Sequence, residues 1–180
     1  MTSNALGSCC YKGVKYEGQL RARIEALGDT EAYVTNPTAE AANGYGILYL
    51  TDIVGYKFIN AQLLADQYAE NGGLWTKENS SYPESSGSNC GVCLEALEKK
   101  DKVKKIALAG YSFGAKYTVR FLTSDRIKAG FIGHPAMVEQ SELEKVTGPL
   151  AIAAAEINYI FPTNLRHSTE ETLKKLGILF

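Results

Sequence analysis

Long apolar runs are missing from this sequence. No stretch approaches the roughly 20 consecutive apolar residues that a membrane-spanning helix needs. The first residues also lack the basic and then apolar pattern of a secretory signal. We therefore expect a cytoplasmic protein with no membrane partner.

An excess of charge of one sign is also missing. The chain has 19 Lys and Arg residues against 20 Asp and Glu residues, a formal net charge of −1. Its densest basic stretch, 99–105, is interrupted by an aspartate. Without a basic surface nothing draws the protein to nucleic acid, so the expected partner is a small-molecule substrate that is neutral or weakly charged.

Histidine and cysteine, the usual metal ligands, are scarce. The chain has two histidines and four cysteines, which occur as the adjacent pair Cys9-Cys10 and the spaced pair Cys90 and Cys93. A four-cysteine zinc site needs two spaced pairs, which argues against the alternative of a metal site. We expect no metal and no other cofactor, with Cys90 and Cys93 as reduced residues just before a helix.

The sequence does contain an alternation of strand and helix patterns. Its 180 residues suit one domain, 1–180, with a sizeable core. The first two strands form a predicted hairpin around Gly28-Asp29-Thr30. The alternation predicts an α/β fold, a three-layer, doubly wound and mostly parallel sheet. Strands are expected at 19–27, 31–35, 46–52, 106–109, 129–133 and 149–155, helices at 139–146 and 164–176, and the start of a last strand at 177–180.

The region after the strand 46–52 is harder to interpret. A helix that ends at Asn71 is expected there. Residues 74–89 lack periodicity and are rich in Ser, Asn and Pro, which predicts a loop with at most a short strand at 73–76. The inward face of the helix is predicted to carry Phe58, Leu63, Leu64, Ala65 and Tyr68.

The stretch 104–122 has the pattern of a strand, a tight turn and a helix. The apolar run 106–109 meets Gly110-Tyr111-Ser112-Phe113-Gly114, after which helical spacing resumes. In a nucleophile elbow of this Gly-x-Ser-x-Gly form, the serine hydroxyl is exposed above the sheet. The next amide, that of Phe113, then faces the developing oxyanion. The alternative is an ordinary strand-to-helix turn, which also favours small residues.

Other stretches accompany the elbow, namely Leu50 to Gly55, Gly133-His134-Pro135, Ser8-Cys9-Cys10 and Ala153 to Glu156. With them, the sequence resembles the dienelactone hydrolase family of the α/β-hydrolase superfamily, in its fungal branch. The resemblance implies a fold truncated at the C-terminus and in the lid region, since 74–89 is short for the family's substrate-covering segment. Trp75 would then cover the gap or line a pocket.

The resemblance also implies an incomplete catalytic triad. Relatives carry a cysteine where Ser112 stands and an acid where Asn158 stands, and their histidine would lie beyond Phe180. Asn158 can hydrogen-bond an imidazole but cannot supply a negative charge. The resemblance makes the backbone N–H of Ile53 the second oxyanion donor.

A serine needs a base that takes its proton. We predict His134 in this role, because it follows a strand beside that of Ser112 and both strands end at the same edge; the alternative is a histidine that only caps its strand. Asp52 ends a strand at this edge and either takes part in proton transfer or caps its loop. His167 is expected on a helix surface. Further candidates are a second buried carboxylate, Glu156, and tyrosines that could donate hydrogen bonds to a ligand at this rim, Tyr56, Tyr111 and Tyr159.

These observations predict an enzyme that opens a small lactone or ester through Ser112. The alternative is a non-hydrolytic isomerase, cyclase or ligand-binding protein that reuses the former hydrolase pocket through Asp52, His134 and the tyrosines. A protein with no turnover is a third reading. The truncated last strand leaves a sheet edge, so a homodimer is a further expectation.

Overall fold

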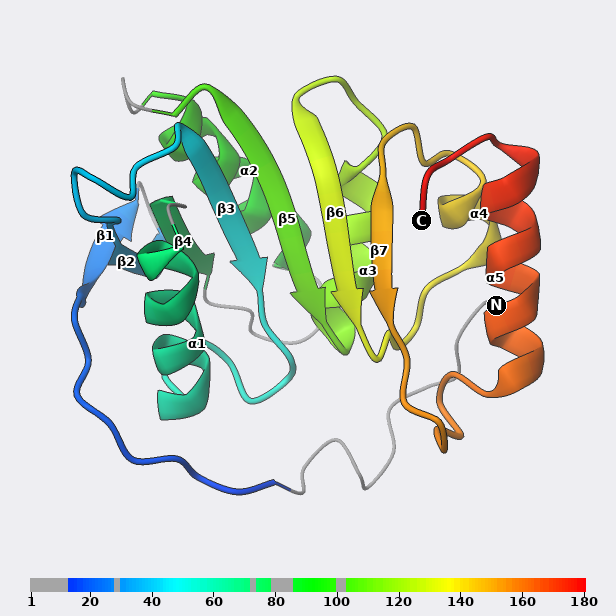
Figure 1. Cartoon of the computed structure of the whole chain (residues 1–180), viewed down its shortest axis with the longest axis horizontal. Coiled ribbons are helices and arrows are strands. Elements are labelled where there is room, and N and C mark those ends of the chain that lie inside the picture. The colour runs from blue at the N-terminus through cyan, green and yellow to red at the C-terminus, as the bar shows by residue number, and fades with distance from the viewer. Residues whose placement is uncertain (1–12, 28–29, 72–73, 79–85, 100–102) are drawn as a thin grey trace.

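The computed structural model describes residues 13–27, 30–71, 74–78, 86–99 and 103–180. Within them, seven strands form one sheet in the order β1-β2-β4-β3-β5-β6-β7 (Figure 1). The strands are β1 (Arg23–Leu27), β2 (Thr30–Thr35), β3 (Tyr45–Leu50), β4 (Leu74–Glu78), β5 (Lys105–Tyr111), β6 (Ile127–Gly133) and β7 (Leu150–Ala153). The helices are α1 (Ile59–Glu70), α2 (Ser86–Glu98), α3 (Phe113–Phe121), α4 (Gln140–Leu143) and α5 (Thr163–Lys175).

The sheet is antiparallel at one end and parallel in the rest. β1 and β2 pair antiparallel as the predicted hairpin, and β2 also pairs antiparallel with β4. From β4 through β3, β5 and β6 to β7 every pairing is parallel, with a helix connecting each strand to the next along the chain from β3 onward. Because parallel strands end at the same edge, the residues after β3, β5 and β6 are brought together there.

Helices cover both faces of this sheet. α1 lies on one face against β2 and β4, while α2 and α3 lie on the other face (Figure 1). Alternate residues of the strands point to opposite faces of the sheet and contribute to two hydrophobic clusters. Leu48 and Leu108 belong to the cluster with α2 and α3, whereas Tyr49 and Ala109 belong to the cluster under α1. This confirms the three-layer α/β fold predicted from the sequence.

The prediction for 74–89 holds in part, because the short strand expected at 73–76 is present and ends two residues later, whereas 86–89 belong to a helix and not to a loop. Residues 74–78 form β4, which pairs on one side with β3 and on the other with β2. Backbone pairing to two neighbours therefore stabilises a strand that has no alternating pattern of its own. Residues 79–85 and the Trp75 side chain lie outside the described part, as does Ser8-Cys9-Cys10.

The helix α2 begins at Ser86, earlier than predicted. Cys90 and Cys93 therefore lie inside the helix rather than before it, and both are buried together with Leu94 and Leu97. These four positions have the i, i+3, i+4, i+7 spacing of a buried helix face. The two cysteines occupy apolar positions of this helix face. Counting them as apolar residues would have extended the predicted helix to include both of them.

The inward face of α1 agrees in part with the prediction. Its buried hydrophobic residues are Ala61, Ala65 and Ala69. Of the predicted residues, Ala65 is among them, and Leu64 and Tyr68 pack partly buried against the same cluster. Small side chains allow the helix axis to approach the sheet closely. Leu63 is only half-buried and packs against the N-terminal segment at Gly18. The contact is close, since a Cβ built on Gly18 would lie 2.7 Å from Leu63 Cδ2.

The predicted last strand at 177–180 is absent from the described residues. One hydrogen bond of such a strand is present, from the Leu150 N–H to the Leu179 carbonyl, at 3.0 Å.

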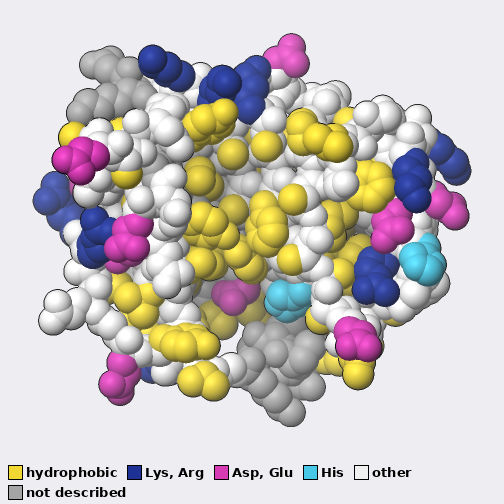
Figure 2. Space-filling view, in the orientation of Figure 1, with side chains coloured by type: hydrophobic (Ala, Val, Ile, Leu, Met, Phe, Trp, Pro, Cys, Tyr) yellow, Lys and Arg dark blue, Asp and Glu magenta, His cyan; other side chains and the backbone are white. Residues whose placement is uncertain are grey.

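On the face that carries α1, hydrophobic side chains gather over the middle of the sheet between α1 and α5 (Figure 2). None of the helices formed by the described residues is long and apolar enough to cross a membrane.

Candidate functional site

Ser112 lies in a strained turn between β5 and α3. Its backbone angles are φ 52° and ψ −111°, values that a side-chain-bearing residue rarely adopts. Only glycine fits at the two flanking positions, because neighbouring backbone atoms occupy the space that a Cβ would need. A Cβ on Gly110 would lie 2.4 Å from the Gly114 carbonyl oxygen, and one on Gly114 would lie 2.1 Å from that of Leu50. The geometry is that of the predicted nucleophile elbow.

The loop after β6 is fastened to this turn. Tyr111 and Gly133 are opposite each other in the β5–β6 register, so Ser112 and His134 follow two paired positions. The Ser112 N–H donates to the Gly133 carbonyl at 2.9 Å, and the Ala136 N–H donates to the Ser112 carbonyl at 3.1 Å. His134 is therefore next to Ser112 at the edge of the sheet, as predicted.

The Ser112 side chain is more enclosed than expected. The residue is 1% exposed, and its Oγ is buried with no hydrogen-bond partner in the described residues. The expectation of an exposed hydroxyl is therefore wrong for this conformation. The loop from His134 to Ala136 contributes to the enclosure, since it is hydrogen-bonded to the Ser112 backbone and Ala136 is itself fully buried.

A pocket of about 600 Å³ opens beside the elbow. Three of the predicted site residues line it, namely Asp52, Tyr111 and His134. They come from the ends of β3, β5 and β6, which is the edge where α/β sheets bind ligands. Ser112 is not one of the lining residues, although Tyr111 directly precedes it.

Asp52 acts as a loop cap in this structure. Its Oδ1 accepts hydrogen bonds from the backbone N–H of Val54 at 3.0 Å and of Gly55 at 3.4 Å. Of the two roles open for this carboxylate, capping is thus observed directly. Asp52 still faces the pocket, and its charge adds to the effect of burial in raising the pKa of Tyr49.

Tyr111 forms the aromatic wall of the pocket. Its hydroxyl is 3.1 Å from that of Tyr68, and burial, together with this hydrogen bond, raises the pKa of Tyr111. The phenol is therefore a neutral hydrogen-bonding group at physiological pH. Its ring contacts Tyr49 edge-on, with 5.3 Å between ring centroids, and lies over Gly133, where an added Cβ would be 2.7 Å from the ring.

Other predicted residues lie away from this pocket. The Tyr56 hydroxyl is bonded to Glu31 Oε2 at 2.8 Å, with the Tyr56 side chain buried. Asn158 Oδ1 accepts hydrogen bonds from the N–H groups of Ile160 and Phe161 at 2.9 and 3.2 Å, so it caps a turn. The expectation of a buried carboxylate at position 156 is wrong, because this residue is exposed, in a bend three residues after the end of β7. Tyr159 and His167 are also exposed.

The two predicted oxyanion donors flank the elbow. Phe113 is the first residue of α3, and its ring packs edge-on against Tyr117 with 5.2 Å between centroids. Ile53 follows the end of β3 and packs partly buried against the core. The start of α3 and the end of β3 are in contact, since Gly114 packs against the Leu50 carbonyl. The role of both amides as donors stays a prediction.

Sequence reasoning missed the N-terminal wall of the pocket. Residues 13–16, here called the strap, line the pocket opposite the strand ends. Asn60 of α1 holds the strap, because its Oδ1 accepts the Tyr16 N–H at 2.8 Å and its Nδ2 donates to the Val14 carbonyl at 2.7 Å. The residues that pair are more than 40 positions apart, so no local pattern could have revealed the contact.

The elbow at the end of a parallel strand, within this strand order, defines an α/β-hydrolase. The chain belongs to the dienelactone hydrolase family, whose model matches residues 78–180. It is 36% identical over 207 residues to the hydrolase tropI of Talaromyces stipitatus, a match that covers 98% of this chain and 81% of that relative. It is 29% identical over 202 residues to the hydrolase pyvD of Aspergillus violaceofuscus, covering 99% of this chain and 81% of the relative.

These two relatives are fungal, in agreement with the predicted branch. Both aligned lengths exceed the 180 residues of this chain, so each relative carries residues within the matched stretch that this chain lacks. This agrees with the predicted shortening. The family and its hydrolase relatives support a hydrolase-type function.

Solved structures share the fold at low sequence identity. The dienelactone hydrolase-like promiscuous phosphotriesterase P91 from metagenomic libraries matches with a TM-score of 0.72 and 12% identity, over 89% of this chain and 79% of that chain. Thermogutta terrifontis esterase 2 phosphonylated by sarin matches with a TM-score of 0.65 and 12% identity, over 92% of this chain and 84% of that chain. These likenesses confirm the fold.

Proposed function

We propose that the protein hydrolyses a small lactone or ester, with Ser112 as the nucleophile. The observation that carries this proposal is the strained backbone of Ser112 at φ 52° between β5 and α3. Strain of this kind persists where the surrounding structure enforces it, and it is typical of nucleophile elbows. A turn without function would be expected to relax, or to carry glycine at the strained position.

In this proposal His134 takes the proton of the serine. It is half-buried at the strand end beside that of Ser112, and it lines the pocket. The amides of Phe113 and Ile53 would hold the oxyanion that forms when Oγ attacks the carbonyl carbon. The tetrahedral intermediate then collapses as the C–O bond to the leaving alcohol breaks and that oxygen takes the proton from His134. Water hydrolyses the acyl-enzyme in a second, equivalent step.

The pocket suits a small substrate that makes both polar and apolar contacts. Tyr111 offers a neutral hydroxyl, Asp52 and His134 offer polar groups, and the ring of Tyr49 adds an aromatic surface. Because Ser112 Oγ is enclosed, substrate binding must displace the neighbouring loop enough for the carbonyl carbon to approach within about 3–3.5 Å of the oxygen. We expect this opening to limit the rate for bulky esters.

A small fluorophosphonate probe tests the nucleophile, and a phosphonylated esterase of the same fold supports this choice. We expect labelling of Ser112, detected by mass spectrometry of the intact protein and of the modified peptide. Ser112→Ala should abolish both labelling and ester hydrolysis. His134→Ala should slow both by about 10² to 10⁴, the range for loss of a general base. An exposed histidine serves as a control, and His167→Ala should leave both rates unchanged.

A second function is favoured by one observation. Asp52, Tyr111 and His134 line the pocket, whereas Ser112 does not. A non-hydrolytic isomerase, a cyclase or a ligand-binding protein could use these three side chains and leave the serine idle. In that case Ser112→Ala would retain full turnover or ligand affinity, while His134→Ala and Asp52→Asn would lose it. The paired variants therefore separate the two functions.

A further inference from the structure

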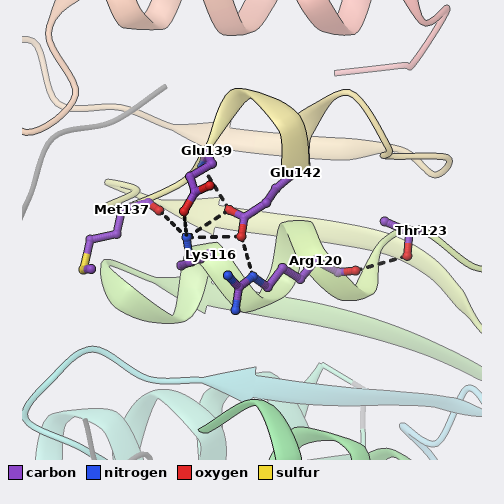
Figure 3. A network of polar contacts seen from close by, with 6 residues as sticks. All are labelled: Lys116, Arg120, Thr123, Met137, Glu139 and Glu142. Atoms are coloured by element: carbon purple, nitrogen blue, oxygen red, sulfur yellow. Dashed lines mark hydrogen bonds and ion pairs between the residues drawn. The ribbon is translucent and has the colours of Figure 1, made fainter. Parts of the chain in front are cut away.

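A buried ammonium group lies behind the elbow. Lys116 belongs to α3, four residues after Ser112, and its side chain is 9% exposed. Its Nζ donates to the Met137 carbonyl at 2.8 Å, to Glu139 Oε1 at 3.0 Å and to Glu142 Oε2 at 3.2 Å (Figure 3). All three acceptors belong to the segment that follows β6, so this one side chain joins the elbow helix to that segment.

The network around Lys116 is fully satisfied. An ammonium has three donors, and here the three acceptors include two carboxylates. Glu142 is 11% exposed on its side chain and also accepts from Arg120 Nε. The Glu139 side chain in turn caps α4, in a capping box with Glu142. Lys116 and Glu142 are buried, whereas the Glu139 side chain is 53% exposed. A buried ammonium is retained only where partners compensate its desolvation, and the Met137 carbonyl is one of these partners.

The loop that Lys116 holds is strained. His134 has φ 32° and Met137 has φ 62°, both in the region that side-chain-bearing residues adopt at a cost. The loop is anchored at its start by the His134 N–H, which donates to the Ala153 carbonyl at 2.8 Å, and in its middle by the bond from Ala136 to Ser112. Lys116 supplies the anchor at its end, on the carbonyl of the strained Met137.

We propose that Lys116 is a positioning residue, which holds the loop from His134 to Met137 in its strained conformation and thereby fixes the imidazole of His134 beside Ser112. This inference rests on the proposed function, in which His134 is the base. Lys116 does not line the pocket, so it acts through the loop and not on the substrate.

The test compares Lys116→Met with Arg120→Met. Both variants remove a cation that contacts Glu142, but only Lys116 contacts the Met137 carbonyl. We expect Lys116→Met to lower kcat for a small ester, and the labelling rate of Ser112, at least tenfold with KM changed less than threefold. Arg120→Met should keep wild-type kinetics. Equal losses in both variants, or a folded Lys116→Met variant with wild-type rates, would overturn the proposal.

A rescue experiment separates positioning from general support. Asparagine accepts positive φ better than methionine does, so Met137→Asn should need less help to hold the loop. We expect Met137→Asn to restore most of the rate lost in Lys116→Met, whereas a purely structural role of Lys116 predicts no restoration. If Lys116→Met fails to fold, Glu139→Gln takes its place, because it weakens one of the three contacts and should give a smaller loss of the same kind.

A nuclear magnetic resonance readout keeps this inference distinct from the proposed function. The chain has two histidines, and His167→Gln assigns their Cε1–H resonances. Lys116→Met should shift or broaden the His134 resonance and leave the exposed His167 unchanged, and Arg120→Met should leave both unchanged. If Ser112 is never labelled, the hydrolase proposal is refuted. A shifted His134 resonance in Lys116→Met would still support the role of Lys116 in that case. An unmoved resonance would refute that role.

Discussion

Ser112 combines two unfavourable features at one position. Its backbone is strained, and its hydroxyl is buried with no hydrogen-bond partner in the described residues. An unsatisfied buried polar group costs about 1–3 kcal/mol. Nothing in the packing of the turn requires an oxygen there, so the serine is better explained by chemistry than by stability.

Replacement of this serine should therefore stabilise the fold. We expect Ser112→Ala to raise the free energy of unfolding by about 1–3 kcal/mol, because alanine keeps the backbone but removes the unsatisfied oxygen. Urea denaturation followed by circular dichroism measures the change. Ser168→Ala, at an exposed position of α5, should change little. A destabilised Ser112→Ala variant would mean that the hydroxyl has a structural partner.

Tyr33 and Asp66 form a buried pair that responds to alkaline pH. The Tyr33 hydroxyl donates to Asp66 Oδ2 at 2.9 Å, and burial, with this hydrogen bond, raises the pKa of Tyr33 from 10.0 to about 12. Between these values the unfolded chain releases the phenolic proton while the folded protein keeps it. The contribution to stability is thus complete below pH 10 and is lost as the pH rises toward 12.

The matching experiment follows unfolding free energy from pH 9 to pH 12, a range chosen around the two pKa values. Other tyrosines also titrate there, so the difference between the wild type and Tyr33→Phe isolates this pair. We expect the advantage of the wild type to shrink steadily across the range. A difference that does not vary with pH would contradict the raised pKa.

At the scale of elements, the sequence predicted those whose pattern is local. The hairpin, the central strand and the strand, turn and helix around Ser112 were all recognised from residue spacing, and the family resemblance added their order. β4 was predicted only as a short strand at 73–76 within a loop, because its stability comes from pairing with β2 and β3. The same limit applies to the site. His134 and Asp52 could be placed at one edge, but the enclosure of Ser112 depends on contacts between distant segments.

The strap shows how a segment can be fixed by very few contacts. Residues 13–20 are exposed, so little apolar burial holds them and the two hydrogen bonds of Asn60 carry much of the attachment. Asn60→Leu should free the strap and accelerate tryptic cleavage after Lys15, with the urea midpoint nearly unchanged. Asn71→Ala, at the other end of α1 and away from the strap, is the matched control. Equal cleavage of both variants would show that other contacts hold the strap.

At the scale of the molecule, β7 leaves one edge of the parallel sheet unpaired over most of its described length. Its Ala151 and Ala153 are exposed, and hydrophobic side chains gather over the sheet between α1 and α5 (Figure 2). We expect two copies to associate through this edge, since unpaired strands invite pairing. Sedimentation velocity at increasing concentration should detect a dimer in the wild type and a monomer in Ala151→Lys. A concentration-independent monomer in both would contradict this expectation.

The contact between Gly133 and Tyr111 bears on which molecules can enter. The ring occupies the space where any larger residue at 133 would put its first carbon, and Tyr49 and Phe131 limit how far the ring can turn. A single methyl group at this position would push the phenol toward the cavity and reduce the volume of the cavity. The width of the cavity is therefore limited by a hydrogen atom of Gly133, a residue that does not itself line it.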